Sequence, residues 1–208
     1  MLLLLVRHGL TDWNESGRLL GRIDIGLNAR GQRQADALGA ALADYGIETL
    51  LASPQRRTQE TAAAIAAATG LTIRTEPALD EVWLGPQWQG RTFAELAGDP
   101  DIRRMAADPT HECDAIEPAA SVRDRVARLV EEMQRQHEGA TVALVSHGDP
   151  LRILIGHHLG MELGCLRRLT VSPGSLSALA VSSRGARLFL LNWRPGSVSF
   201  GDTLSGIL

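Results

Sequence analysis

Two histidines follow apolar runs of the chain, at points where a side chain could take part in chemistry. Residues 2–6 are all leucine or valine and lead into Arg7 and His8, and the apolar stretch 141–146 leads into His147. An imidazole can serve as a nucleophile or a proton carrier, and a guanidinium group binds phosphate oxygens through two parallel hydrogen bonds. This pattern indicates a site for a phosphate-like anion.

These apolar runs have the length and composition of strands buried on both faces of a parallel sheet, whose carboxyl ends carry functional groups. The sequence therefore predicts an α/β fold, a three-layer α/β/α arrangement with a mostly parallel central sheet. Further strands are expected at 49–52 and 71–74 and a hairpin over 177–191. Helices are expected over 28–45, 55–69, 121–139 and 149–160.

Local signals place more functional groups at the same edge of the sheet. Ser53 is expected to cap a helix on which Arg57 and Thr61 share one face, and Asp149 is expected to cap another. Glu81 follows a further strand. We expect Gly9 to let the backbone approach a ligand closely, because it has no side chain.

Composition limits the classes of function. The 208 residues carry a net charge of −3, which disfavours a general nucleic-acid or membrane-surface binder. All 21 basic residues are arginine, so any phosphate held by side-chain cations is held by guanidinium groups. We expect a single domain over 1–208, with a helical insertion at 86–120 as a lid or side wall and a C-terminal tail at 193–208.

The two cysteines, Cys113 and Cys165, show neither metal-ligand nor redox spacing, and we interpret both as reduced thiols. The leucine run has no basic segment before it and no small-residue cleavage site after it, which argues against a signal peptide. These features predict a cytoplasmic protein. They leave the oligomeric state open, a homodimer included.

Taken together, four segments of the chain resemble the histidine phosphatase superfamily, also called the phosphoglycerate mutase-like family. The resemblance depends on order and spacing over about residues 2–160, and no single segment would suffice. The segments are Arg7-His8-Gly9-x-Thr11-x-x-Asn14, Ser53-x-x-x-Arg57-x-x-x-Thr61-Ala62, Leu79-x-Glu81 and Ser146-His147-Gly148.

The resemblance implies hydrolysis of a small phosphorylated metabolite through a phosphohistidine formed on His8. Glu81 would act as general acid and then as general base. Flanking arginines would keep the His8 imidazole neutral. The implied catalytic set is Arg7, His8, Arg57, Glu81 and His147, and the implied substrate-binding set is Arg7, Asn14, Gly21, Arg57 and Gly148. No cofactor and no metal ion are implied.

Two other functions remain open at this stage. Phosphoglycerate mutases carry Glu-Arg-His-Tyr-Gly after the acid, whereas this chain reads Glu-Val-Trp-Leu-Gly over 81–85, which favours a phosphatase. Arg103 and Arg104 could still clamp a substrate carboxylate and keep a mutase as the alternative. A phospholigand-binding protein without activity on the same fold is the third reading.

Two further expectations concern a possible metal site and the apolar residues that follow Glu81. A metal site built from His8, His147 and Glu81 is disfavoured by the adjacent arginines, and the pair at 157–158 cannot face one ligand from a helix. Trp83, Leu84 and Trp88 either form an apolar surface for a bulky leaving group or pack the insertion onto the core.

Overall fold

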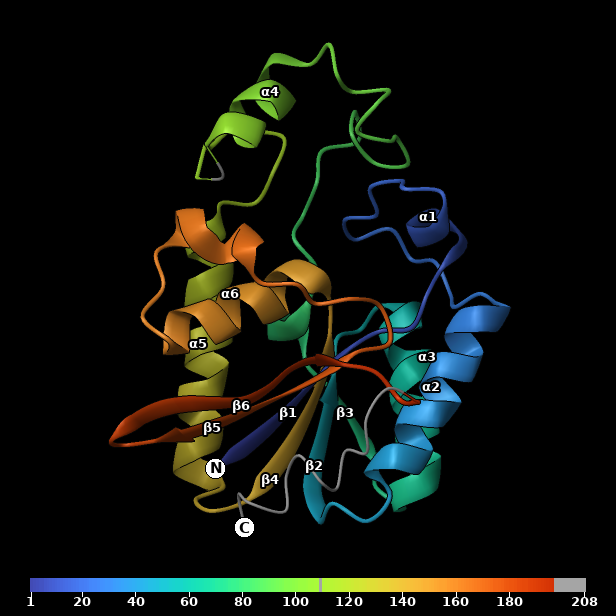
Figure 1. Ribbon diagram of the computed structural model, residues 1–208, viewed down its shortest axis with the longest axis vertical. Helices are drawn as coiled ribbons and strands as arrows, with labels where there is room; N and C mark the ends of the chain where they lie inside the picture. The colour runs from blue at the N-terminus through green and yellow to red at the C-terminus, as the bar shows by residue number, and fades with distance from the viewer. Residues whose placement is uncertain (109, 197–208) are drawn as a thin grey trace.

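The computed structural model describes residues 1–108 and 110–196 of the chain. Six strands form one sheet in the order β3-β2-β4-β1-β5-β6 (Figure 1). The pairs β1–β4, β2–β4 and β2–β3 are parallel, whereas β5 and β6 join antiparallel at one edge. The strands are β1 (Leu2–Arg7), β2 (Ile47–Ala52), β3 (Ile73–Thr75), β4 (Thr141–Ser146), β5 (Leu176–Ser182) and β6 (Gly185–Trp193). The predicted mostly parallel sheet and its hairpin are confirmed.

Helices cover both faces of this sheet, with α2 and α3 on one side and α5 and α6 on the other (Figure 1). Side chains of β1 alternate between the two layers, because successive residues of a strand point to opposite faces. Leu3 and Leu5 belong to the apolar cluster of α5 and α6, and Leu4 and Val6 to that of α2 and α3. The helices are α1 (Asp12–Glu15), α2 (Ala29–Leu42), α3 (Arg56–Thr69), α4 (Pro100–Ala107), α5 (Ala119–Gln136) and α6 (Gly148–His158), with the 3₁₀ turns η1 (Pro77–Leu79) and η2 (Leu163–Arg168).

The strand register brings the functional segments together. Arg7 at the end of β1 pairs with Ser146 at the end of β4, and Ala52 at the end of β2 pairs with Val145. Because these three strands are parallel neighbours, the residues that follow them emerge at one edge of the sheet. Figure 1 shows α1, α4 and the connecting segments around them beyond that edge.

Two helices begin at residues other than the predicted ones. The N-cap of α3 is Gln55, not Ser53, and α6 begins at Gly148 with His147 as its N-cap rather than at Asp149. For Ser53 the reason is tertiary, because its hydroxyl bonds to His147 and Asp80, which lie far along the chain. Asp149 instead lies in the first turn of α6 and pairs with Arg152, three residues further along the same helix. At Ser53 the distant partners have outweighed the local capping preference.

The segment predicted as an insertion contains α4 and a series of turns. The hydroxyl of Thr92 and the carboxylate of Glu95 make reciprocal hydrogen bonds with backbone amides, which close a turn and not a helix. Trp88, Leu96 and Ile102 are buried in the same cluster as α5 and α6. A role as lid, and the single-domain assignment, stay predictions.

β6 includes Trp193, the first residue of the predicted tail, and most of that tail (197–208) lies outside the described residues. Among the residues that the structure describes, no helix has the length and apolar character needed to cross a bilayer.

Candidate active site

The five candidate catalytic residues meet at the carboxyl edge of the sheet. The rings of His8 and His147 lie edge to face with centroids 5.1 Å apart, and the Nε of Arg57 donates to Nδ1 of His147 over 3.2 Å. A Cβ atom built on Gly148 would lie 3.2 Å from Cζ of Arg7. Three segments from distant parts of the chain therefore deliver two imidazoles and two guanidinium groups to one place.

His8 is held as one tautomer. Its Nδ1 lies 2.7 Å from the carbonyl oxygen of Gly9, and because a carbonyl only accepts, Nδ1 carries the proton and Nε2 keeps its lone pair. The ring is buried, with an exposed fraction of 1%. Burial lowers the pKa of His8 well below its usual range, and Arg57 and Arg7 lower it further. The sequence interpretation named the arginines but missed the larger effect of burial.

His147 belongs to a chain of hydrogen bonds that sequence reasoning missed. Since Arg57 donates to Nδ1, the proton of the ring sits on Nε2, which donates to the hydroxyl of Ser53 over 2.9 Å. Ser53 in turn donates to the carboxylate of Asp80 at 2.9 Å. This chain fixes the ring orientation of His147, and a phosphate oxygen would have to compete with Ser53 for its Nε2–H. The Ser-Pro pair after a strand was the available signal, and it was interpreted only as a cap.

Arg57 is fully buried yet anchored by oxygen atoms around it. Its two terminal nitrogens donate to the carbonyls of Ile23 and Gly21 and to the side-chain oxygen of Gln55, over 2.8–3.0 Å. Burial lowers the pKa of Arg57 to about 10, so the group stays cationic at neutral pH. Gly21, expected to bind substrate, uses its carbonyl to position this guanidinium group.

Arg7 and Asn14 retain donors that a ligand could use. One terminal nitrogen of Arg7 donates to the carbonyl of Val171 at 2.6 Å, but its Nε is buried without a hydrogen-bond partner among the described residues. The Asn14 side-chain oxygen accepts from the backbone and hydroxyl of Thr11, which caps α1. That arrangement uses the oxygen of Asn14 and leaves its NH₂ group as the donor.

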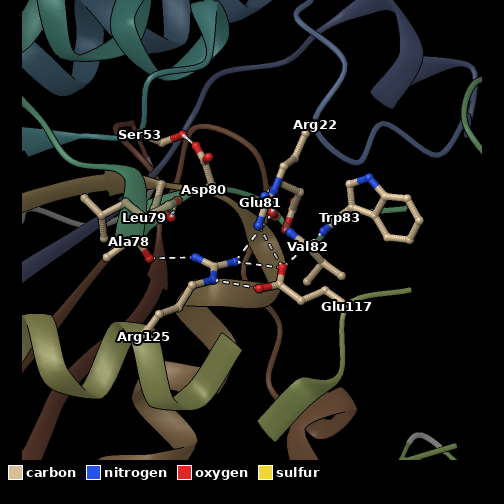
Figure 2. Close-up of polar contacts among 11 residues, drawn as sticks. Arg22, Ser53, Ala78, Leu79, Asp80, Glu81, Val82, Trp83, Glu117 and Arg125 are labelled. Carbon is tan, nitrogen blue, oxygen red and sulfur yellow. Dashed lines mark hydrogen bonds and ion pairs between the residues drawn. The ribbon is translucent and has the colours of Figure 1, made fainter. Parts of the chain in front are cut away.

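The loop that carries Glu81 is fastened by two arginines and a glutamate (Figure 2). Arg22 and Arg125 both donate to the carbonyl of Glu81, over 2.9 and 3.5 Å, and both pair with the carboxylate of Glu117. Arg125 also donates to the carbonyl of Ala78 at 2.6 Å. We call Arg22, Glu117 and Arg125 the loop anchor; it joins the segment after β1, the end of the insertion and α5.

The carboxyl group of Glu81 is set up to exchange a proton near neutral pH. Burial, followed by the charge of Asp149, raises the pKa of Glu81 to about 7, against the opposing effects of Arg57 and Arg7. One oxygen accepts from the amide of Val82 at 3.0 Å. A carboxyl group with such a pKa can donate a proton and take one back at neutral pH.

The role expected for Gly9 is wrong in one respect. A Cβ atom there would collide with the backbone of Gly31 at the start of α2, and one on Gly31 would collide with the backbone of Leu10. The missing side chain lets the catalytic loop pack directly on α2, not on a ligand. Thr61, on the predicted shared face with Arg57, accepts from the amide of Gly9 at 3.1 Å and so holds the same loop.

The donor set at this site suits an anion better than a metal ion, because two guanidinium groups flank the imidazoles and a dication there would be repelled. Elsewhere in the described chain, ligand-type atoms of Asp101, His111 and Cys113 lie within 4.8 Å of one another, in the insertion. There the Asp101 carboxylate is already paired with Arg104 and His111.

Comparisons with known proteins agree with this geometry. The sequence profile of the histidine phosphatase superfamily (branch 1) matches residues 3–194. The chain is 33% identical over 193 residues to Phosphoserine phosphatase 1 of Hydrogenobacter thermophilus, covering 91% of both chains. It is 31% identical over 175 residues to a protein of Erwinia tasmaniensis named "Probable phosphoglycerate mutase GpmB", covering 83% of this chain and 81% of the other.

Among solved structures, a mycobacterial glucosyl-3-phosphoglycerate phosphatase superposes with a TM-score of 0.84 at 29% identity, covering 92% of this chain and 98% of that one. The chain belongs to the histidine phosphatase superfamily, and it is an enzyme of the phosphoric monoester hydrolase class. The resemblance drawn from the sequence is confirmed.

Proposed function

We propose that this enzyme hydrolyses a small phosphomonoester through a phosphohistidine intermediate on His8. In the first step the Nε2 lone pair attacks phosphorus, the bond to the alcohol oxygen breaks, and Glu81 gives its proton to that oxygen. Arg7 and Arg57 stabilise the charge that spreads over the non-bridging oxygens, with donors of Asn14, His147 and the amide of Gly148 beside them.

The second step returns the enzyme to its starting state. The Glu81 carboxylate takes a proton from water while the water oxygen attacks phosphorus, and the P–N bond breaks with its electrons returning to Nε2 of His8. Phosphate leaves, and Glu81 is again protonated. Each proton and electron pair is accounted for by these two residues and one water molecule.

The observation that carries the proposal is the state of His8. Its Nδ1 proton is committed to the Gly9 carbonyl, its pKa is lowered, and its remaining lone pair lies between the guanidinium groups that would hold phosphate. A binding protein without activity would need the cations but not this nucleophile or an acid such as Glu81. The phosphatases among the relatives support the same reading.

A mutase is the alternative function, and relatives named as mutases support it. The surroundings of Glu81 support hydrolysis instead. Val82, next to the acid, is buried and has no charge to bind a carboxylate. Arg103 donates to the carbonyls of Ala97 and Gly98, and Arg104 pairs with Asp101, so neither residue is set up as the clamp considered above.

Labelling tests the proposal directly. After brief incubation with a ³²P-labelled phosphomonoester, we expect label on His8 that is lost in acid and kept in alkali. A His8→Ala protein should neither acquire label nor release phosphate, whereas His157→Ala, which removes an exposed imidazole, should do both as the parent does. Undiminished hydrolysis by His8→Ala would refute the mechanism. Label that passes to a second hydroxyl and not to water would identify a mutase.

A further inference from the structure

We propose that the substrate of this enzyme is the phosphomonoester of a bulky, apolar alcohol, held in a cavity between the insertion and α6. This inference rests on the proposed function and adds the class of alcohol to it. The sequence left two roles open for the apolar residues after Glu81, namely packing or contact with the leaving group. Leu84 and Trp88 pack in the apolar cluster of α5 and α6 and also line the cavity, so they serve the first role and are placed for the second.

In-line attack fixes where the alcohol must lie. The leaving oxygen departs opposite the attacking Nε2 of His8, and the general acid Glu81 must reach that oxygen. The rest of the alcohol therefore extends past Glu81, away from the two imidazoles. The bound alcohol and the residues beside Glu81 must be in contact.

A cavity of about 310 Å³ lies beside that point; the candidate catalytic residues do not line it, but their neighbours in the chain do. Its wall includes Val82, the neighbour of Glu81, Asp149, the neighbour of Gly148, and Leu84, whose side chain packs against Gly21. At about 30 Å³ for each water-sized group, the cavity accommodates on the order of ten non-hydrogen atoms. It is larger than glycerate or serine needs.

The wall of this cavity is mainly apolar. Its apolar side chains include Val82, Leu84, Trp88, Phe93, Ile102 and Met105. Phe93 lines the cavity and is 61% exposed, so its ring is accessible to a ligand there. Trp83, which sequence analysis grouped with Leu84 and Trp88, is not part of the wall.

The charged groups around the cavity are mostly committed to one another. Arg152 donates to Asp149 at 2.6 Å, and the carboxylate of Glu117 pairs with the arginines of the loop anchor. Arg167 and His111 complete the charged and titratable lining, with Arg167 exposed at the rim. A carboxylate next to the phosphoester would lie near Asp149, which disfavours glycerate-like and serine-like alcohols.

Arg152 supplies a polar contact to this cavity. Its Nε is buried without a hydrogen-bond partner among the described residues, and its terminal nitrogen would lie 3.5 Å from a Cβ atom on Gly148. This donor sits between the phosphate site and the apolar wall. It can bond to the ester oxygen or to a phosphate oxygen of a substrate that fills the cavity.

A series of n-alkyl phosphates tests the inference, because the alcohols differ in apolar surface but hardly in leaving-group acidity. From ethyl to hexyl phosphate we expect kcat/KM to rise about twofold to fourfold for each methylene group. Hexyl phosphate should exceed glycerol phosphate and phosphoserine by at least about tenfold. Phe93→Ser and Met105→Ser should flatten this dependence, and Leu159→Ser, at an exposed leucine outside the cavity, should keep it.

A flat series, with phosphoserine hydrolysed faster than hexyl phosphate, would overturn the inference and leave the phosphatase proposal standing. The two failures are thus distinct, since a protein that releases phosphate from no monoester would contradict the proposed function itself. A steep series that survives both cavity substitutions would also overturn the assignment of this cavity. Thermal unfolding of each variant separates loss of binding from loss of fold.

Discussion

At the scale of single residues, burial shifts the pKa values of His8 and Glu81 in opposite directions, and both shifts favour the same chemical step. It lowers the pKa of the imidazole and raises that of the carboxyl group, because a low-dielectric surrounding disfavours the charged form of either. Burial therefore favours the uncharged form of both groups. The first chemical step needs both in that state, an imidazole with a lone pair and a carboxylic acid with a proton.

The pH profile should report this arrangement. Since the pKa of Glu81 is about 7, we expect kcat/KM for an alkyl phosphate to fall above pH 7 as the general acid loses its proton. Glu81→Gln should remove this limb and lower kcat by about 10²–10⁴-fold. Initial rates from pH 5 to 9 measure this limb in the parent and in Glu81→Gln. Ionisation of the substrate phosphate affects both proteins equally and so provides the internal control. An unchanged limb in Glu81→Gln would contradict the assignment.

Stability should change with pH through the same residue. The folded-state pKa of Glu81, about 7, lies above its ordinary value of 4.5, so the folded protein binds more protons between these values. Its stability therefore falls as pH rises through this window. We expect Glu81→Gln to melt at a higher temperature than the parent at pH 8, with little difference at pH 4.5. Equal melting temperatures at pH 8 would count against the raised pKa.

Sequence reasoning named the candidate reactive residues but not the groups that orient them. His8, Arg57, Glu81 and His147 could be predicted because each follows an apolar run or lies on a helix face that the pattern reveals. The hydrogen bond from His147 to Ser53 joins residues 94 positions apart. In the sequence, a serine before a helix is equally well explained as an N-cap. The pattern therefore does not distinguish a capping serine from one that bonds to a distant side chain.

At the scale of elements, glycines set the distance between the catalytic loop and α2. Gly31 lies in the first turn of α2, where alanine would favour the helix by up to about 1 kcal/mol. A Cβ there would meet the Leu10 backbone, however, and forcing extra volume into a packed contact costs about 1–3 kcal/mol. The collision should outweigh the gain in helix propensity.

We therefore expect Gly31→Ala to lower the melting temperature by about 3–10 °C and to reduce kcat, since the displaced loop carries His8. Gly98→Ala is the matched control, because a Cβ atom there meets nothing within 4 Å. Differential scanning calorimetry and steady-state kinetics on both variants check the prediction. A Gly31→Ala protein that is more stable and fully active would show that the contact can relax.

The loop anchor acts on the general acid from a distance. Removing the guanidinium group of Arg125 releases the carbonyl of Ala78 and leaves the carbonyl of Glu81 with Arg22 as its donor, so the Glu81 carboxyl group should be held less firmly. We expect Arg125→Met to lower kcat/KM for alkyl phosphates about tenfold or more. p-Nitrophenyl phosphate, whose leaving group needs little protonation, should lose less than about threefold.

Arg128→Met provides the control for this experiment, because Arg128 is exposed on the same helix. It should leave both substrates unaffected. Equal losses for alkyl and p-nitrophenyl phosphates in Arg125→Met would point to general unfolding and not to displacement of the acid. The anchor could not have been predicted from the sequence, because its three members come from separate segments without a shared pattern.

At the scale of the whole molecule, the sheet was the most predictable feature and the insertion the least. Buried parallel strands are apolar on both faces, so β1 and β4 stand out in the sequence. Residues 86–120 instead use turns and one short helix, and their buried side chains join a cluster built mainly by α5 and α6. Their packing depends on that cluster, which no local pattern in the insertion describes.

The position of β1 between β4 and β5 has a consequence for how the enzyme is made. Its hydrogen-bonding partners are residues 141–146 and 176–180, which leave the ribosome long after it does. At about 5–20 residues per second, roughly 7–35 seconds pass before this apolar strand can be paired on both sides. A nascent chain must shield the strand throughout that time, and the sheet edge that carries the candidate site can form only after residues 141–180 have been synthesised.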